Sequence, residues 1–179
     1  MILENTTIKL RALEPEDLSF LYELENDTSI WHISNTLVPY SKWVLKNYLE
    51  NAHLDIYEAK QLRLVITNAS TGAVIGLIDL FDFDPLNSRV GLGIVINKAE
   101  DKGKGYGSSA LQLVINYVFN YLSIHQIYVN VGVSNEASIN LFSKFGFALI
   151  GIKKQWNKVG NSYVDEGMYQ LINPQNEIK

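Results

Sequence analysis

A glycine run that contains two lysines is the segment best suited to chemistry. It reads Lys102-Gly103-Lys104-Gly105-Tyr106-Gly107-Ser108 and stands directly before apolar residues at helical spacing. Glycine lets the backbone turn tightly and approach a ligand closely. The first N–H groups of a helix have no partner inside the helix, and the helix dipole places positive charge there. The run therefore predicts an anion site of the kind that holds phosphate groups.

Two nucleotide-binding motifs do not fit this run. A P-loop needs Gly-x-x-x-x-Gly-Lys-Ser/Thr, which the sequence does not contain. A dinucleotide fingerprint needs a third glycine where Ser108 stands. It also needs an acidic residue about 20 residues further on, where the chain reads Tyr121-Leu122-Ser123. Neither nucleotide interpretation is retained.

The run and the segment after it resemble the acetyl-coenzyme A signature of the GNAT N-acetyltransferases. Lys102 to Gly107 is similar to the family's pyrophosphate loop, Gln/Arg-x-x-Gly-x-Gly/Ala, with Lys102 in the Gln/Arg place. Asn135–Ser138 and Phe142–Phe147 resemble its Asn-x-x-Ala and Tyr-x-Lys-x-Gly-Phe patterns. Within the superfamily, the chain looks like the ribosomal-protein-alanine and spermidine or diamine N-acetyltransferases.

The resemblance implies transfer of an acetyl group from acetyl-CoA, as co-substrate, to a primary amine: a polyamine, a small amine or a protein N-terminus. The family binds acetyl-CoA between two splayed strands, and a backbone N–H, here that of Val95, would contact the developing oxyanion. No metal is implied. The residues that the resemblance assigns to the coenzyme are Ile94, Val95, Ile96, Lys102, Gly103, Lys104, Gly105, Tyr106, Gly107, Ser108, Asn135, Phe142 and Lys144.

Two of these residues have a second interpretation. Asn135 directly precedes a predicted helix, so it is also a candidate N-cap. Lys144 is also typical of a lysine on the solvent-exposed face of a helix. The two roles of Asn135 can coexist.

Two catalytic groups of the family are missing. Many members protonate the leaving thiolate with a tyrosine, but Phe142 stands at that place. Many relatives also carry an acidic residue early on the strand before the glycine run, where this chain has Gly91. These departures leave a second function open, a non-catalytic acyl-CoA-binding or sensing domain.

Candidates to replace the missing catalytic base are the acidic residues around the end of the strand expected at 73–81. Asp82 is the candidate base or proton relay, with Asp79 as a further candidate, whereas Asp84 is typical of an acidic hairpin turn. His32 has a suitable ordinary pKa but stands alone in a predicted loop. A base matters more for a lysine-like amine, with a pKa of about 10.4, than for an α-amino group near about 8.

Candidate acceptor residues are Trp31, Asp82 and Tyr163. Tyr163 belongs to a Gly-x-x-Tyr-x-Asp segment that often borders the acceptor side in this branch. Core packing is the first expectation for both Trp31 and Trp43, with the acceptor pocket as the alternative.

The elements that must position these residues alternate along the chain, and the fold class is α+β (mixed α/β). We expect the GNAT fold as one domain over residues 1–179. It comprises a largely antiparallel, twisted sheet of about six to seven strands, splayed near the middle and flanked by about four helices. Strands are expected at 8–12, 61–67, 73–81, 89–96, 127–133, 147–152 and 163–171. Helices are expected to open at Pro15 and Ser41 and to span 108–121 and 135–145, with 26–39 as a loop.

Composition limits the partners. The net charge is −4, which argues against nucleic acid as the partner despite Lys153, Lys154 and Lys158. The chain has no cysteine, which fits a reducing compartment such as the cytoplasm. We expect no signal peptide and no membrane span. A homo-oligomer is compatible with the sequence.

Overall fold

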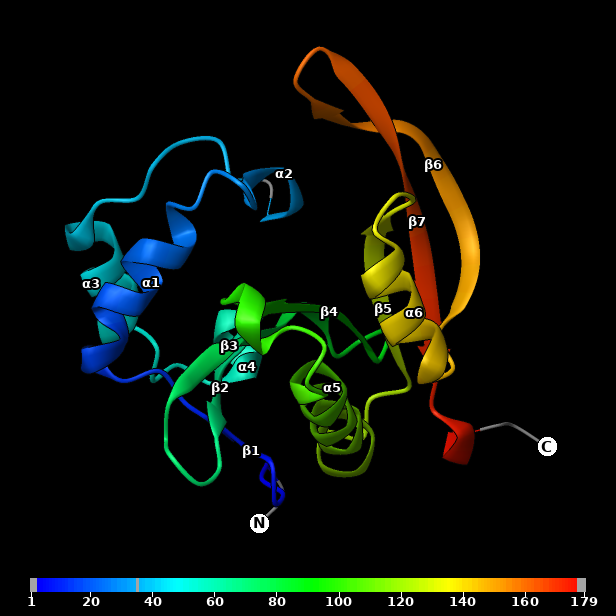
Figure 1. Ribbon diagram of the computed structural model, residues 1–179. Helices are drawn as coiled ribbons and strands as arrows, with labels where there is room; N and C mark the ends of the chain where they lie inside the picture. Colours follow the sequence, from blue (N-terminus) through cyan, green and yellow to red (C-terminus); the bar gives the residue numbers. More distant parts are fainter. Residues whose placement is uncertain (1–2, 35, 177–179) are drawn as a thin grey trace.

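The computed structural model describes residues 3–34 and 36–176. Its core is a seven-stranded sheet in the order β1-β2-β3-β4-β5-β7-β6 (Figure 1). All neighbouring strands are antiparallel except β4 and β5, which run parallel. The strands are β1 (Ile8–Arg11), β2 (Leu62–Asn68), β3 (Val74–Asp84), β4 (Arg89–Ile96), β5 (Gln126–Gly132), β6 (Ala148–Val159) and β7 (Ser162–Ile172). The mixed α and β class and the largely antiparallel sheet are confirmed.

In the described part of the chain, four main helices accompany the sheet, as expected, together with two single-turn helices that the sequence did not predict. The helices are α1 (Leu18–Glu25), α2 (Trp31–Ser34), α3 (Lys42–Glu50), α4 (Ile56–Ala59), α5 (Tyr106–Asn116) and α6 (Glu136–Lys144). A 3-10 turn at Pro15–Asp17 leads into α1, and a π-helical segment, Tyr117–Tyr121, continues α5. Within the described residues no helix is long and apolar enough to cross a membrane.

Some predicted boundaries were wrong. The segment 26–39 is not all loop, because α2 forms inside it. Strand β3 continues three residues beyond the predicted end at Phe81, and α5 begins two residues before Ser108. On α3, Ser41 caps the helix as expected, and its side chain accepts a hydrogen bond from the Val44 N–H.

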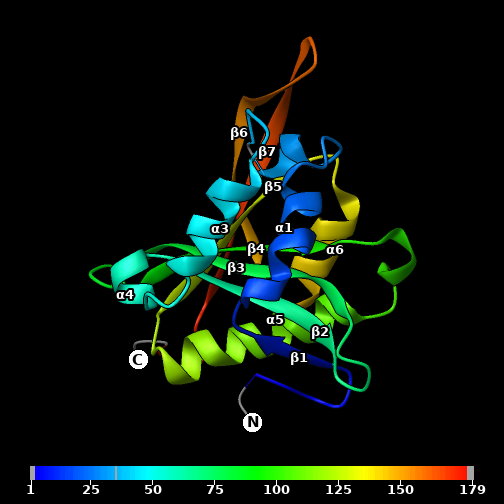
Figure 2. The same ribbon diagram turned by 90° about the vertical axis from the view of Figure 1, so that its left-hand side faces the viewer.

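The helices cover the sheet on both faces (Figure 2). Helices α5 and α6 pack on one face, in the larger core cluster that includes Val90 and Leu92 of β4. Helices α1 and α3 pack on the other face, where a second cluster joins them to Val65 and Leu77. They cover only the β2–β3 side of that face, so no helix of the described residues covers the β5, β7 and β6 side except where α2 contacts β6.

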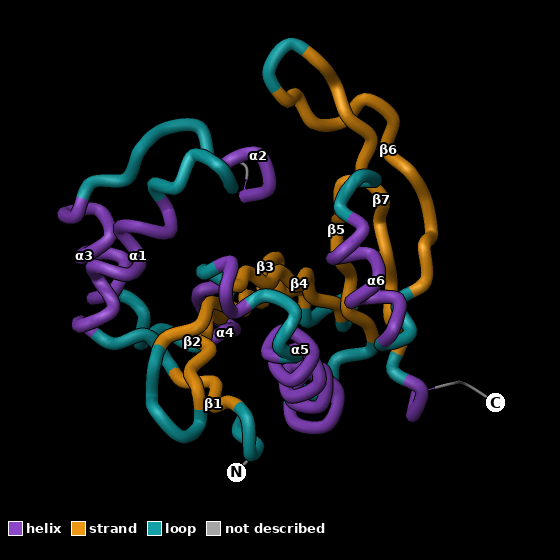
Figure 3. Tube along the Cα trace, in the orientation of Figure 1, coloured by secondary structure: helices purple, strands orange, loops and turns teal. Residues whose placement is uncertain are grey.

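Strands β4 and β5 are neighbours for only three residue pairs: Arg89–Gln126, Val90–Ile127 and Gly91–Tyr128. Beyond Gly91, β4 remains paired with β3 as far as Ile96, and β5 remains paired with β7 as far as Gly132. Each strand therefore follows its outer neighbour, and the two diverge after the vertex at Gly91 and Tyr128. Figure 3 shows the two groups of strands turning away from each other beside α5 and α6.

A clasp between β1 and the start of α1 fixes the first helix to the sheet. The Arg11 guanidinium donates to both oxygens of the Asp17 carboxylate, over 2.7 and 2.8 Å, and the Glu14 N–H donates to the same carboxylate over 2.8 Å. Asp17 is buried. Burial raises its pKa, but these hydrogen bonds outweigh burial and hold the pKa below its usual range.

We expect the substitution Asp17→Asn to lower the free energy of unfolding by about 2 kcal/mol at neutral pH, because it removes a charge-assisted pair. The pKa of Asp17 is lowered by folding, so its contribution is complete above about pH 4 and disappears as the pH falls through the lowered value. Urea denaturation of both proteins at about pH 7 and pH 3 measures this. Glu23→Gln, at an exposed position on α1, is the control. A loss of the same size at both pH values would contradict the clasp.

Candidate active site

The glycine loop presents an uncapped helix terminus. Gly103 and Gly105 have φ of +76° and +85°, in the left-handed region that favours glycine. Gly105 is the N-cap of α5 and has no side chain with which to cap it. By helix geometry the N–H groups of Tyr106, Gly107 and Ser108 have no partner inside the helix. These donors are therefore available to an anion.

The N-terminus of α6 differs, because it is capped by its own chain. The Asn135 side-chain oxygen accepts a hydrogen bond from the Ser138 N–H over 3.2 Å, so the N-cap interpretation of Asn135 is confirmed. At the other end, Gly146 has φ +86°, and Phe147 N–H donates to the Phe142 carbonyl oxygen. The ring of Phe142 packs against Phe147 at 5.3 Å between centroids. Phe142 is therefore buried where it closes this helix end.

Three lysines surround the open terminus or lie on the neighbouring helix. Lys102 and Lys104 are exposed on the loop, and the Lys104 ammonium lies 3.5 Å from the Asp101 carboxylate. Lys144 is exposed in the last turn of α6. Lys102 differs from Lys104, because no carboxylate among the described residues lies at salt-bridge distance from its ammonium group.

Successive N–H groups of β4 point alternately to its two sides, so only some of them face the opening between β4 and β5. Asn97 N–H donates to the Ile75 carbonyl oxygen in the same register that pairs Leu77 with Val95. In an antiparallel pair, hydrogen-bonded positions alternate, so the Val95 N–H also points to β3. The N–H groups of Ile94 and Ile96 then point to the opposite side, where β5 has diverged. This corrects the expected oxyanion contact at Val95, whose N–H is directed away from the gap.

At the vertex, a side chain at position 91, such as the acidic one that many relatives have, would require the Phe81 ring to move. A Cβ atom at Gly91 would lie 2.3 Å from Cε2 of Phe81, well inside van der Waals contact. The Phe81 ring therefore occupies the space of a side chain at position 91. It also meets the Tyr128 ring edge-on, with 6.0 Å between centroids. An aromatic pair thus forms the floor at the vertex.

Asp82 lies beside this floor because β3 is irregular there. The register shifts between Phe81 and Asp84, and Asp82 has φ +49°, which aspartate tolerates better than most residues. The Tyr128 hydroxyl donates to the Asp82 carboxylate over 3.2 Å. Burial and the nearby Asp82 charge raise the pKa of Tyr128 to about 12. Tyr128 therefore keeps its proton and serves as a donor.

The other acidic candidates are occupied. Asp84 accepts from the Asn87 main chain and side chain and pairs with Arg89 at 3.1 Å, which makes it a turn residue, as expected. Asp79 pairs with Arg63 at 2.6 Å, and Arg63 also binds Glu25 of α1 at 2.5 Å. Asp79 therefore belongs to a structural ion-pair network.

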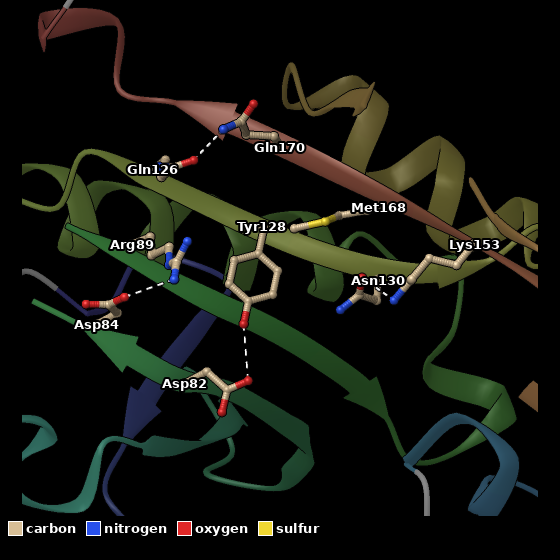
Figure 4. Close-up of a pocket in the computed structure, with 9 residues that line it drawn as sticks. All are labelled: Asp82, Asp84, Arg89, Gln126, Tyr128, Asn130, Lys153, Met168 and Gln170. Atoms are coloured by element: carbon tan, nitrogen blue, oxygen red, sulfur yellow. Dashed lines mark hydrogen bonds and ion pairs between the residues drawn. The ribbon is translucent and has the colours of Figure 1, made fainter. Parts of the chain in front are cut away.

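A hollow of about 480 Å³ lies on the sheet face opposite α5 and α6 (Figure 4). We call it the sheet-face bowl. Its residues come from β3, β4, β5, β6 and β7, and the glycine loop contributes none of them. They are Asp82, Asp84, Arg89, Gln126, Tyr128, Asn130, Lys153, Met168 and Gln170. The bowl reaches the vertex at Tyr128 and includes Asp82, which is hydrogen-bonded to Tyr128.

The remaining acceptor candidates divide between two places. Trp31 is half-buried on α2 and donates from its ring to the Glu25 carbonyl oxygen over 2.9 Å. Tyr163 is 60% exposed near the tip of the β6–β7 hairpin, and Trp43 is 71% exposed, so the expected core packing of Trp43 was wrong. The side chain of His32 lies outside the described residues.

Sequence reasoning missed Tyr128 and the amides around it. The signal was present as polar alternation, because Gln126, Tyr128 and Asn130 share one face of β5 while Ile127 and Val129 are buried on the other. The alternation alone did not show that this face is hollow.

Residues 7–148 match the family model described as an acetyltransferase (GNAT) domain. The chain belongs to the GNAT acetyltransferase family. It is 30% identical over 148 residues to the spermidine N(1)-acetyltransferase of Escherichia coli K12, an alignment that covers 81% of this chain and 75% of that relative. It is 28% identical over 175 residues to the spermidine N(1)-acetyltransferase of Vibrio cholerae, with 92% and 96% covered.

The GNAT fold is also found by comparison with solved structures. The crystal structure of the Vibrio cholerae spermidine N-acetyltransferase in complex with CoA and spermine superposes with a TM-score of 0.84 at 27% identity. That match covers 94% of this chain and 97% of the other. A dodecameric structure of the same relative, in an intermediate state, gives a TM-score of 0.78 at 28% identity, with 94% and 95% covered.

We expect Gly105→Ala to weaken CoA binding by about tenfold. A side chain disfavours the left-handed backbone by about 1–2 kcal/mol, so the loop that presents the first N–H groups of α5 would shift. Gly72→Ala is a matched control, because Gly72 has φ +72° and, like Gly105, has no atom within 4 Å of an added Cβ. Calorimetric CoA titration and urea denaturation separate the effects. Equal CoA affinity in the two variants would contradict a role for this loop.

Proposed function

We propose that this GNAT domain transfers an acetyl group from acetyl-CoA to a primary amine: a polyamine, a small amine or a protein N-terminus. The observation that carries the proposal is the opening between β4 and β5 beside the uncapped start of α5. Unpaired main-chain donors on both elements fit an extended ligand with an anionic end. The CoA and spermine named with the Vibrio cholerae relative support the same assignment.

The donor side of the proposal uses this chain's main-chain groups first. The N–H groups of Tyr106, Gly107 and Ser108 would hold the diphosphate, with Lys102 and Lys104 supplying charge. The N–H groups of Ile94 and Ile96 would bind the pantetheine arm and the thioester oxygen in place of Val95. Acetyl-CoA supplies an activated acyl group when bound.

Asn135 and Lys144 are further proposed contacts of the donor. The Asn135 oxygen is engaged in capping α6, so a contact to the pantetheine arm would come from its amide nitrogen. Lys144 is exposed to solvent and would act on a phosphate as a flexible point charge.

The acid and base steps rest on fewer groups than in other GNAT enzymes. Phe142 cannot protonate the leaving thiolate, but a thiol pKa of about 8.5 makes that thiolate a tolerable leaving group. Asp82 is the proposed base or relay, since it is exposed, hydrogen-bonded to Tyr128 and adjacent to the vertex. An α-amino group needs little help from a base, because neutralising it at pH 7 costs only about 1 kcal/mol.

The acceptor would approach from the face opposite α5 and α6. There α2, with Trp31, contacts β6 across the opening, and Tyr163 lies near the tip of the same hairpin. The lysines of β6 do not form a nucleic-acid surface in this proposal, since Lys153 pairs with Glu166 and Lys154 with Asp165. We propose a cytoplasmic enzyme, and a homo-oligomer is consistent with the dodecamer named for the relative.

The experiment that tests the proposal measures free-thiol release from acetyl-CoA with a panel of polyamines, small amines and N-terminal peptides. We expect turnover above background with at least one class of amine. Calorimetric CoA binding without turnover on the whole panel would favour the second candidate, a non-catalytic acyl-CoA-binding domain, for which Phe142 and Gly91 argue. Absence of both turnover and CoA binding would reject the two functions together.

Asp82→Asn should lower kcat/KM for the amine by about 100-fold, the lower end of the contribution of a general base. The substitution removes the charge and keeps the backbone, because asparagine also tolerates the left-handed region. Thiol release at saturating acetyl-CoA measures the effect. Asp55→Asn, which preserves the N-cap of α4, is the control. Unchanged kcat/KM in Asp82→Asn would exclude Asp82 from proton transfer.

A further inference from the structure

The sheet-face bowl has a charge balance that does not suit a polyamine. Both cationic side chains that line it are already paired with a carboxylate, because Arg89 pairs with Asp84 and Lys153 pairs with Glu166. Asp82 has no cation at salt-bridge distance within the described part of the chain, and it accepts from the Tyr128 hydroxyl. The bowl therefore offers one carboxylate to an ammonium group, whereas a polyamine carries two or more ammonium groups.

Apart from Met168, the rest of the bowl is lined with neutral hydrogen-bonding groups. Gln126 and Asn130 lie on β5 on either side of Tyr128, and Gln170 lies opposite Tyr128 on β7. Directly opposed side chains in such a pair are about 5 Å apart, so Gln170 adjoins Tyr128, whereas Asn130 lies on the other side of Tyr128, opposite Met168. Gln170 donates to Gln126, and Asn130 accepts from Lys153 over 3.1 Å. Each amide thus keeps further donor or acceptor capacity for a ligand.

The bowl begins where the acetyl group would be delivered. Tyr128 belongs to the last residue pair before β4 and β5 diverge, and its side chain points to the same face as the bowl (Figure 4). Asp82 follows Phe81, which pairs with Gly91 at the vertex, and it accepts a hydrogen bond from the Tyr128 hydroxyl. These two groups therefore form the edge of the bowl next to the vertex. A ligand with its ammonium group beside Asp82 would extend its remaining atoms over Gln170 and Gln126.

We propose that the sheet-face bowl is an acceptor subsite for an amine that carries a single ammonium group and a neutral tail rich in amide or hydroxyl groups. This inference rests on the proposed acetyltransferase function and narrows its substrate class. It separates this chain from the relatives named for spermidine.

Matched acceptors test the tail directly. 1,4-Diaminobutane and its mono-N-acetyl derivative share one carbon chain and differ in whether the far end is an ammonium or an amide. We expect kcat/KM to be at least tenfold higher for the mono-acetyl compound. A dipeptide amide with a free α-amino group and a 2-amino sugar then distinguish an amide tail from a hydroxyl tail, and at least one of them should exceed the diamine.

Gln170→Met tests the subsite itself. Methionine keeps the length of the side chain and removes the amide, so we expect KM for the preferred acceptor to rise about five- to tenfold, the loss of one hydrogen bond. KM for acetyl-CoA should not change, and the loss should be larger for the preferred acceptor than for the diamine, whose far ammonium group gains least from a neutral amide. Gln126→Met is a second variant with the same expectation. Gln112→Met, exposed on α5, is the matched control.

The outcomes separate this inference from the function on which it rests. Turnover that favours the diamine, or equal acceptor KM in Gln170→Met, Gln126→Met and the control, would overturn the subsite and leave the acetyltransferase intact. Absence of turnover with every amine would overturn the acetyltransferase and the subsite with it.

Discussion

The brief pairing of β4 with β5 is the constraint on which the rest of the site depends. The strands share three residue pairs, and each then follows a different antiparallel neighbour, β3 on one side and β7 on the other. Ladder hydrogen bonds with those neighbours hold the strands apart. The divergence leaves the inward N–H groups of Ile94 and Ile96 without a strand partner. Main-chain polar groups need a hydrogen-bond partner when covered, and an extended ligand along β4 would supply it.

The two helices after these strands divide the remaining tasks. Helix α6 is closed at both ends by its own chain, through Asn135 at the start and Gly146 at the finish. Helix α5 starts from Gly105, which offers no cap. One helix is thus a packing element, and the other leaves its first N–H groups open, as the proposed diphosphate site requires. Across the sheet, the described parts of α1 and α3 cover β2 and β3 but not the β5–β7 face, which fits the proposal that donor and acceptor approach from opposite faces.

The parts that followed from local sequence were predicted well, and those that depend on contacts across strands were not. The bounds of β4, the Ser41 and Asn135 caps and the glycine loop depend on neighbouring residues along the chain. The direction of the Val95 N–H depends on the register with β3. The place of Asp82 depends on a shift in that same register, and the closure of position 91 depends on the Phe81 ring. Such pairings join residues distant in sequence, so periodicity could not supply them.

Residue-resolved amide hydrogen exchange, followed by NMR with and without CoA, tests the central claim most directly. The account predicts that Val95 is protected in both states, because its N–H is bonded to β3. Ile94, Ile96 and the first N–H groups of α5, at Gly107 and Ser108, should exchange quickly in the free protein and become protected when CoA is added. Fast exchange at Val95, or CoA protection confined to residues away from β4 and the start of α5, would contradict it.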